Sequence, residues 1–130
     1  MSAAAASPRA TRRALWLLTY APTVWALHFL ASYVSAALYC AKWADATGVL
    51  GPVRLLIGLF TVLALLAIGV TAWRGYRQHR YGEDGAVPHD AATAADRHRF
   101  LGFATLLLCG LSAVATIYVA MAVIFIGSCR

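Results

Sequence analysis

The chain has 130 residues, of which 62% are hydrophobic and 12% are charged, and it carries a formal net charge of +6. Soluble domains are about half apolar and about a quarter charged, so this composition excludes a water-soluble globule. The length leaves room for a single domain.

The apolar residues fall into three long blocks, at about residues 14–40, 53–73 and 100–127. Each block reaches the roughly 20 residues that a helix needs to cross about 30 Å of hydrocarbon. Isolated strands would leave backbone groups unpaired in lipid, and three strands cannot close a barrel. The sequence therefore predicts an all-α membrane protein, with one three-helix transmembrane domain at residues 14–127 after a disordered basic tail at residues 1–13.

The first block follows three arginines, as the apolar segment of a cleaved signal peptide would. It is too long for such a segment, and the residues from Tyr39 to Trp43 do not resemble a cleavage site, so we expect the block to be retained. Pro22 lacks an amide hydrogen, and it either kinks one long helix or occupies the first turn of a span that begins there. In the second case, residues 14–21 form a short interfacial segment.

Basic residues next to the spans predict the orientation, because Lys and Arg are retained on the cytoplasmic side. They are concentrated in the N-terminal tail and in the loop at residues 74–99, and few flank the other ends of the spans. The first group is Arg9, Arg12, Arg13, Arg74, Arg77, Arg80, Arg97 and Arg99, and the second is Lys42, Arg54 and Arg130. We expect a cytoplasmic N-terminus and loop and a periplasmic C-terminus, and we attribute the positive charge to topology rather than to nucleic-acid binding.

The helices are expected to extend beyond the membrane on the side of the long loop. The second helix should continue through Arg80, with Gly82 placed to end it as a left-handed cap. Thr93 followed by Asp96 resembles a capping box, so we expect the third helix to begin about two turns before the membrane.

Polar residues inside the spans form two stripes at helical spacing. The first stripe is His28, Ser32, Ser35 and Tyr39, and the second is Thr105, Cys109, Ser112 and Thr116, extended by Gly102 and Ala120. Small and hydroxyl residues permit close helix approach and interhelical hydrogen bonds. We expect both stripes to be helix-contact faces that look into the bundle, either for packing alone or as contacts with another subunit.

His28 is the only histidine within a span, and it is the one candidate cofactor ligand. A b-type haem held between two imidazoles needs a second histidine, and His79, His89 and His98 all lie on the cytoplasmic side. His28 would pair with His98 only if Pro22 brought it close to the inner surface. Contact with a quinone or a neighbouring subunit has no distinguishing spacing. A hydrogen-bonded structural histidine is the simpler interpretation, so we expect no cofactor.

The histidines of the long loop, together with Asp84, Asp90 and Asp96, match no zinc spacing, and no cysteine is nearby. We interpret the segment as solvated and expect no metal site. Its arginines attract anionic headgroups in the way that any such group does.

Cys40 and Cys129 lie at the predicted external ends of the spans, where a bacterial compartment is oxidising. They form a disulfide if their Cα atoms come within about 7 Å, and otherwise they are two free thiols. No external histidine or methionine completes a copper site with them. Cys109 lies mid-span and is expected to pack as a small residue.

The sequence has no Ser-His-Asp set, no phosphate-binding loop and no acidic pair within the spans, so we do not expect an enzyme.

Four segments carry the strongest overall pattern: residues 22–30 (PTVWALHFL) with Tyr33 and Ala37, 73–77 (WRGYR), 96–103 (DRHRFLGF) and 127–130 (GSCR). Together they resemble a family of small three-helix bacterial membrane proteins that is often associated with gene clusters for haem-copper cytochrome c oxidases. The resemblance covers the three spans and implies a location, the bacterial inner membrane, and a respiratory partner. The resemblance does not identify any functional residue in this chain.

The leading hypothesis is a non-catalytic accessory or assembly subunit of a respiratory terminal oxidase complex, in contact with the lipid bilayer and with other membrane subunits. One alternative is a small b-type haem-binding electron carrier, which needs His28 as a ligand. The other is a homo-oligomeric transporter or channel component, for which the sequence offers no evident substrate site.

Overall fold

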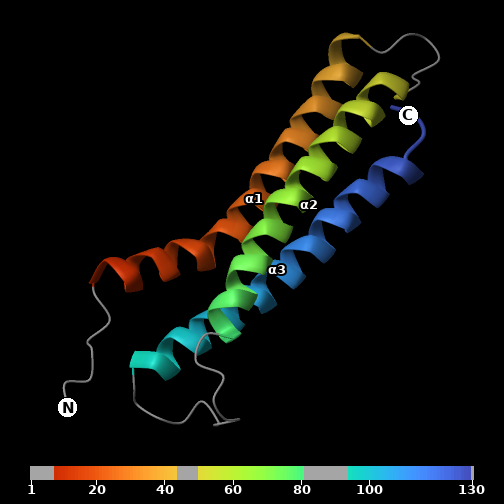
Figure 1. The fold of residues 1–130 in the computed structure, drawn as a ribbon. Coiled ribbons are helices and arrows are strands. Elements are labelled where there is room, and N and C mark those ends of the chain that lie inside the picture. Colours follow the sequence, from red (N-terminus) through yellow and green to blue (C-terminus); the bar gives the residue numbers. More distant parts are fainter. Residues whose placement is uncertain (1–7, 44–49, 81–93, 130) are drawn as a thin grey trace, which may run out of the picture.

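The structure is a computed structural model that describes residues 8–43, 50–80 and 94–129. It contains three helices, α1 (Pro8–Lys42), α2 (Gly51–Arg80) and α3 (Ala94–Phe125) (Figure 1). All three are long and apolar enough to cross a membrane. The predicted all-α fold with three membrane-spanning helices is therefore confirmed. The orientation of the bundle in the membrane stays a prediction; we call the end with Arg80 and Ala94, predicted to be cytoplasmic, the inner end, and the opposite end the outer end.

All three helices extend beyond their apolar blocks on the side predicted to be cytoplasmic. The described part of α2 continues to Arg80, and α3 begins before Phe100. Both agree with the extensions predicted from the turn and capping residues. The predicted Gly82 cap and the Thr93 end of the capping box lie outside the described residues.

The helix α1 begins at Pro8, so residues 8–13 are helical and the prediction of a disordered tail is wrong for them, while residues 1–7 of that tail lie outside the described residues. Proline suits the first position of a helix because its missing amide hydrogen would have no helical partner there. Ala and Arg, which follow it, are good helix formers, and they continue the helix into the apolar block.

Pro22 lies inside α1, and the first of the two alternatives, a kinked long helix, is the one observed. Figure 1 shows the N-terminal part of α1 running at an angle away from the other helices, whereas its later part lies along them. A proline removes one helical hydrogen bond and clashes with the preceding turn, which explains a bend at this position. We call residues 8–21 the limb.

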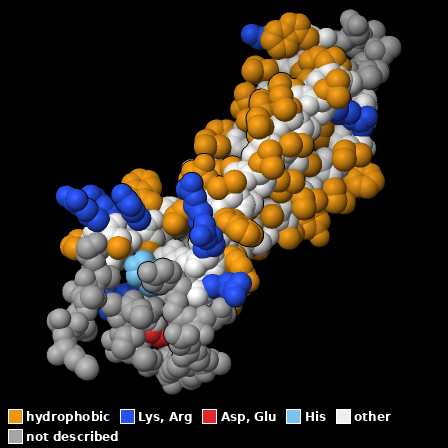
Figure 2. All heavy atoms as spheres, in the orientation of Figure 1, with side chains coloured by type: hydrophobic (Ala, Val, Ile, Leu, Met, Phe, Trp, Pro, Cys, Tyr) orange, Lys and Arg blue, Asp and Glu red, His pale blue; other side chains and the backbone are white. Residues whose placement is uncertain are grey.

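The bundle is thin and its apolar residues face outward. Each pair of helices packs together, with α2 and α3 packing most extensively. Ala21, Ile68 and Cys109 form the centre of the core, one from each helix. Large side chains such as Leu55 and Leu63 are exposed, and Figure 2 shows hydrophobic side chains covering this face of the bundle. Such a surface matches a protein whose solvent is lipid.

The backbones of α2 and α3 come into direct contact at Gly75 and Gly102. A Cβ atom added to Gly102 would lie 2.8 Å from the backbone nitrogen of His79 and 2.9 Å from the carbonyl oxygen of Gly75. The two backbones touch here because neither residue carries a side chain. Small residues at helix crossings are the usual device for close packing in membranes.

Candidate functional site

The polar stripe of α1 begins at His28, which is buried with 4% of its surface exposed. Its Nε2 lies 3.0 Å from Oγ1 of Thr61 on α2. Thr61 donates its hydroxyl hydrogen to the carbonyl oxygen of Ile57 at 2.7 Å, so its oxygen is left to accept from His28. The proton of the neutral imidazole is therefore on Nε2, and Nδ1 carries the free lone pair. The partner of His28 thus lies on α2 and not on the stripe of α3.

Three buried polar atoms of α1 lack a hydrogen-bond partner among the described residues: Nε1 of Trp25, Nδ1 of His28 and Oγ of Ser32. They are spaced by three and four positions and so share one side of the helix. In a low-dielectric interior such atoms normally find a partner or a water molecule. The stripe of α1 is thus only partly satisfied, and Nδ1 of neutral His28 is an available acceptor.

The stripe of α3 is buried, as predicted. Thr105, Cys109, Ser112 and Thr116 are all buried. Thr105 and Thr116 donate to the carbonyl oxygens of the preceding turn, at 2.8 Å in each case, so their hydroxyls are satisfied within α3. These residues pack the centre of the bundle and are covered by its other helices, so they do not form a free surface for another subunit.

The later members of the α1 stripe, Ser35 and Tyr39, are half-buried. The stripe thus leaves the core toward the outer end of the helix.

A haem between His28 and His98 does not fit this geometry. Nε2 of Gln78, at the inner end of α2, donates to Nδ1 of His98 at 2.8 Å, whereas His28 bonds to Thr61. Thr61 and Gln78 are separated by about 25 Å along α2 at about 1.5 Å per residue. Two axial ligands must both touch one iron. The pair is therefore too widely separated, even with the kink at Pro22.

The inner end of the bundle is held by polar contacts between α2 and α3. Besides the Gln78–His98 pair, Nδ1 of His79 lies 3.3 Å from the carbonyl oxygen of Arg99. The ring of His79 also packs on Phe103, with centroids 5.8 Å apart. No group of three or more His, Cys, Asp or Glu side chains comes together within the ranges that the structure describes. His89, Asp84 and Asp90 lie outside those ranges.

The outer end carries a disulfide between Cys40 and Cys129, with Cα atoms 5.7 Å apart. This pairing is one of the two states that the sequence left open. Arg54 of α2 donates to the carbonyl oxygens of Val123 and Ile124, which are among the last residues of α3. These carbonyls lack helical partners, and a cation there also complements the helix dipole. The free cysteine Cys109 is buried.

Three aromatic rings follow one another along α1, of which Trp25 is half-buried and Phe29 and Tyr33 are exposed. Trp25 and Phe29 have ring centroids 6.4 Å apart, and Phe29 and Tyr33 stack at 6.4 Å. We call these three residues the aromatic ladder. Their spacing of four positions within a span was the signal that could have revealed it.

Tyr33 ends the aromatic ladder and is 66% exposed. At about 1.5 Å per residue, Tyr33 lies about 16 Å from Pro22 and about 14 Å from Lys42, so it is near the middle of the span. Side chains of a helix lean toward its N-terminus, so the ring does not reach the outer surface. Its hydroxyl has no hydrogen-bond partner among the described residues.

Comparison of the chain with protein-family models, with curated proteins and with solved structures gives no match. The function therefore has to be argued from the residues themselves.

Proposed function

We propose that the protein is a non-catalytic accessory or assembly subunit of a larger membrane complex, and that the aromatic ladder of α1 is its contact surface. The observation that carries the proposal is Tyr33, an exposed phenol near the middle of a membrane span whose ring stacks on Phe29. Tyr118 of α3 is similarly exposed but has no ring contact among the described residues. A polar group in lipid is unfavourable unless it has a partner, and helices from other subunits supply such partners.

The rest of the ladder supports the same surface. Aromatic side chains bury large areas and are enriched at interfaces, where the polar tip of Tyr finds a hydrogen bond. The α3 stripe and the first two members of the α1 stripe, His28 and Ser32, are covered inside the bundle, so they offer no free surface to another subunit.

The identity of the partner rests on the resemblance of the sequence alone. It favours a subunit of a respiratory haem-copper oxidase in a bacterial inner membrane. The disulfide agrees with this location, because such bonds persist on the oxidising side of that membrane.

The first experiment is to purify the tagged full-length chain from its native membrane in mild detergent, to record the visible spectrum and to identify the co-purifying proteins. Oxidase subunits in near-stoichiometric amounts, with haem lost when they are removed, are the expected result. A lone chain that keeps its own Soret band would overturn the proposal in favour of the electron carrier, and a defined oligomer of this chain alone would favour the transporter or channel component.

Site-specific photo-crosslinking then tests the surface. A benzophenone side chain placed at Tyr33 should capture the partner, whereas the same group at Leu63 of α2, also exposed, should not. Tyr33→Phe removes only the hydroxyl and should weaken association by about threefold, the usual contribution of one interhelical hydrogen bond. Tyr118→Phe, at the similarly exposed tyrosine of α3, is the matched control. Equal crosslinking from positions 33 and 63 would show that the aromatic ladder is not the contact surface.

A further inference from the structure

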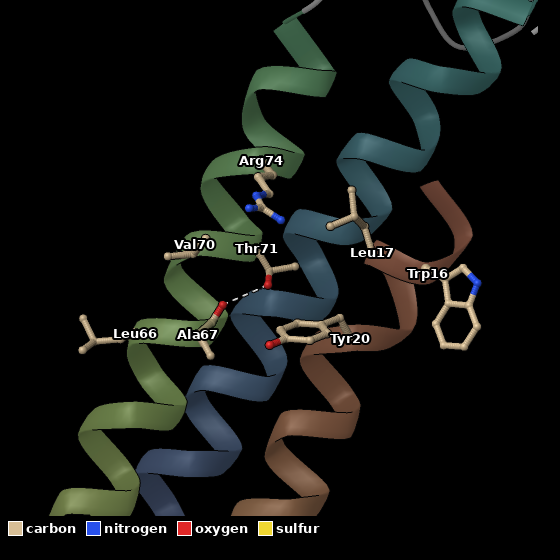
Figure 3. Close-up of a pocket in the computed structure, with 8 residues that line it drawn as sticks. All are labelled: Trp16, Leu17, Tyr20, Leu66, Ala67, Val70, Thr71 and Arg74. Carbon is tan, nitrogen blue, oxygen red and sulfur yellow. Dashed lines mark hydrogen bonds between the residues drawn. The ribbon is translucent and has the colours of Figure 1, made fainter. Parts of the chain in front are cut away.

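The kink at Pro22 opens a groove between the limb and the inner half of α2. Three residues of the limb and five of α2 line it: Trp16, Leu17, Tyr20, Leu66, Ala67, Val70, Thr71 and Arg74. Its volume is about 420 Å³. Figure 3 shows Arg74 toward one end of this lining and Leu66 toward the other, with the ring of Tyr20 extending from α1. We call it the elbow groove.

The lining of the elbow groove changes from apolar to basic along α2. Leu66 and Arg74 are separated by about 12 Å at about 1.5 Å per residue. Leu66, Ala67 and Val70 lie within the apolar run, and Arg74 is the first charged residue after it. Thr71 donates to the carbonyl oxygen of Ala67 at 2.9 Å, so its hydroxyl hydrogen is already used. One end of the groove therefore matches hydrocarbon, and the other end matches an anion.

Trp16 and Tyr20 line the groove from the limb. Both are residue types that prefer the headgroup zone of a bilayer, where an amphipathic ring has an apolar and a wet side. Their position places the basic end of the groove at the membrane surface, with the apolar end beneath it. A phospholipid has the matching arrangement, because its phosphate lies at the membrane surface and its acyl chains lie beneath it.

The charge around the elbow groove is positive. Arg77 lies one turn beyond Arg74 and is exposed. An adjoining groove, which shares Leu17, is lined by Arg9 and Arg13 of the limb. Figure 2 shows Lys and Arg side chains gathered at this end of the molecule, and none of the described residues that line the two grooves is acidic. Arg74 forms no ion pair among the described residues.

We propose that the elbow groove binds an anionic phospholipid, with the lipid phosphate on the Arg74 guanidinium and an acyl chain along Leu66 and Val70. Arginine presents several donors in a planar fork that matches phosphate oxygens. A neutral quinone would leave that charge unused, and a soluble anion would leave the apolar wall uncovered. A basic pocket next to helices at the membrane surface is the recognised form of an anionic-lipid site.

Native mass spectrometry of the detergent-solubilised full-length chain tests the proposal. Phosphatidylglycerol is the anionic probe and phosphatidylcholine the zwitterionic one. We expect tighter binding of phosphatidylglycerol, and Arg74→Gln should reduce that preference by about fivefold, as expected for one arginine near a membrane surface. Arg97→Gln is the matched control, because it removes the same charge from α3 at the same end of the bundle and lines neither groove.

A second pair of variants tests the acyl wall. Val70→Trp should fill the elbow groove and abolish the preferred lipid adduct, whereas Val62→Trp should not. Both valines are exposed on α2, at 53% and 55% respectively, so neither substitution should disturb the packing of the core. Equal binding of the two lipids, an unchanged preference in Arg74→Gln, or retention of the adduct by Val70→Trp would overturn the proposal. Displacement of the lipid by millimolar inorganic phosphate would show a simple anion site and would overturn it as well.

Discussion

The two ends of the bundle are held together in different ways. At the outer end, a disulfide joins α1 to the segment after α3, and Arg54 of α2 bonds to the last turn of α3. At the inner end, α2 and α3 stay together through Gly75 and Gly102 and the Gln78–His98 hydrogen bond. The limb of α1 turns away from them there (Figure 1).

The helices are therefore held more firmly at the outer end than at the inner end. All three helices are linked at the outer end, one of the links being covalent. At the inner end the backbones of α2 and α3 touch, whereas the limb buries Ala14 and Ala21 but leaves the elbow groove between itself and α2. A surface that has to admit a lipid is thus located at the less constrained end.

Loss of the disulfide should have the largest effect on the stability of the bundle. The double variant Cys40→Ser with Cys129→Ser should lower the free energy of unfolding by about 2–4 kcal/mol, because the bridge closes a long loop. Unfolding in a denaturing-detergent titration measures this difference. Reductant should destabilise the wild type by the same amount and leave the double variant unchanged. If both cysteines of the non-reduced wild type are alkylated, the outer end is not covalently closed.

Loss of the glycine contact should destabilise the inner end to a smaller extent. Gly102→Ala places a Cβ atom 2.8 Å from the backbone of His79, so α2 and α3 must separate. Overpacking of this kind costs about 1–3 kcal/mol. The control is Gly110→Ala in the same helix, because nothing lies within 4 Å of a Cβ atom there. A stability of Gly102→Ala equal to that of Gly110→Ala would contradict the close contact.

Hydrophobicity and small-residue patterns were enough to predict the three helices and the buried α3 stripe. Each apolar block is long enough for only one interpretation in lipid, since backbone groups there must be paired within the segment. The spacing of Thr105, Cys109, Ser112 and Thr116 likewise allows only one face. These features depend on the local sequence, so they could be predicted without a partner helix.

The features that depend on two helices could not be predicted. The sequence could not identify Thr61 as the partner of His28, because Thr61 and Thr71 both bond to their own helix and only the packing of α1 on α2 decides which one also meets His28. Nor could it choose between the two roles of Pro22, each of which a proline can fill. The elbow groove follows from that choice, so it was also beyond the sequence.

The smallest predicted effect concerns the middle of the bundle, between the two ends. Thr61→Val removes the acceptor for His28 and leaves a buried N–H without a partner, so stability should fall by about 0.6–1.7 kcal/mol, the range for interhelical hydrogen bonds in membranes. Thr71→Val is the control, since this buried threonine bonds only within α2.

A double-mutant cycle with His28→Leu isolates the hydrogen bond from the change in packing. The combined variant should be more stable than the sum of the two single effects predicts, because the second substitution removes a bond that the first has already broken. Strict additivity would mean that His28 and Thr61 do not interact. The α1 stripe would then contribute packing alone, and α1 would be held only by the outer end and by its apolar contacts with α2 and α3.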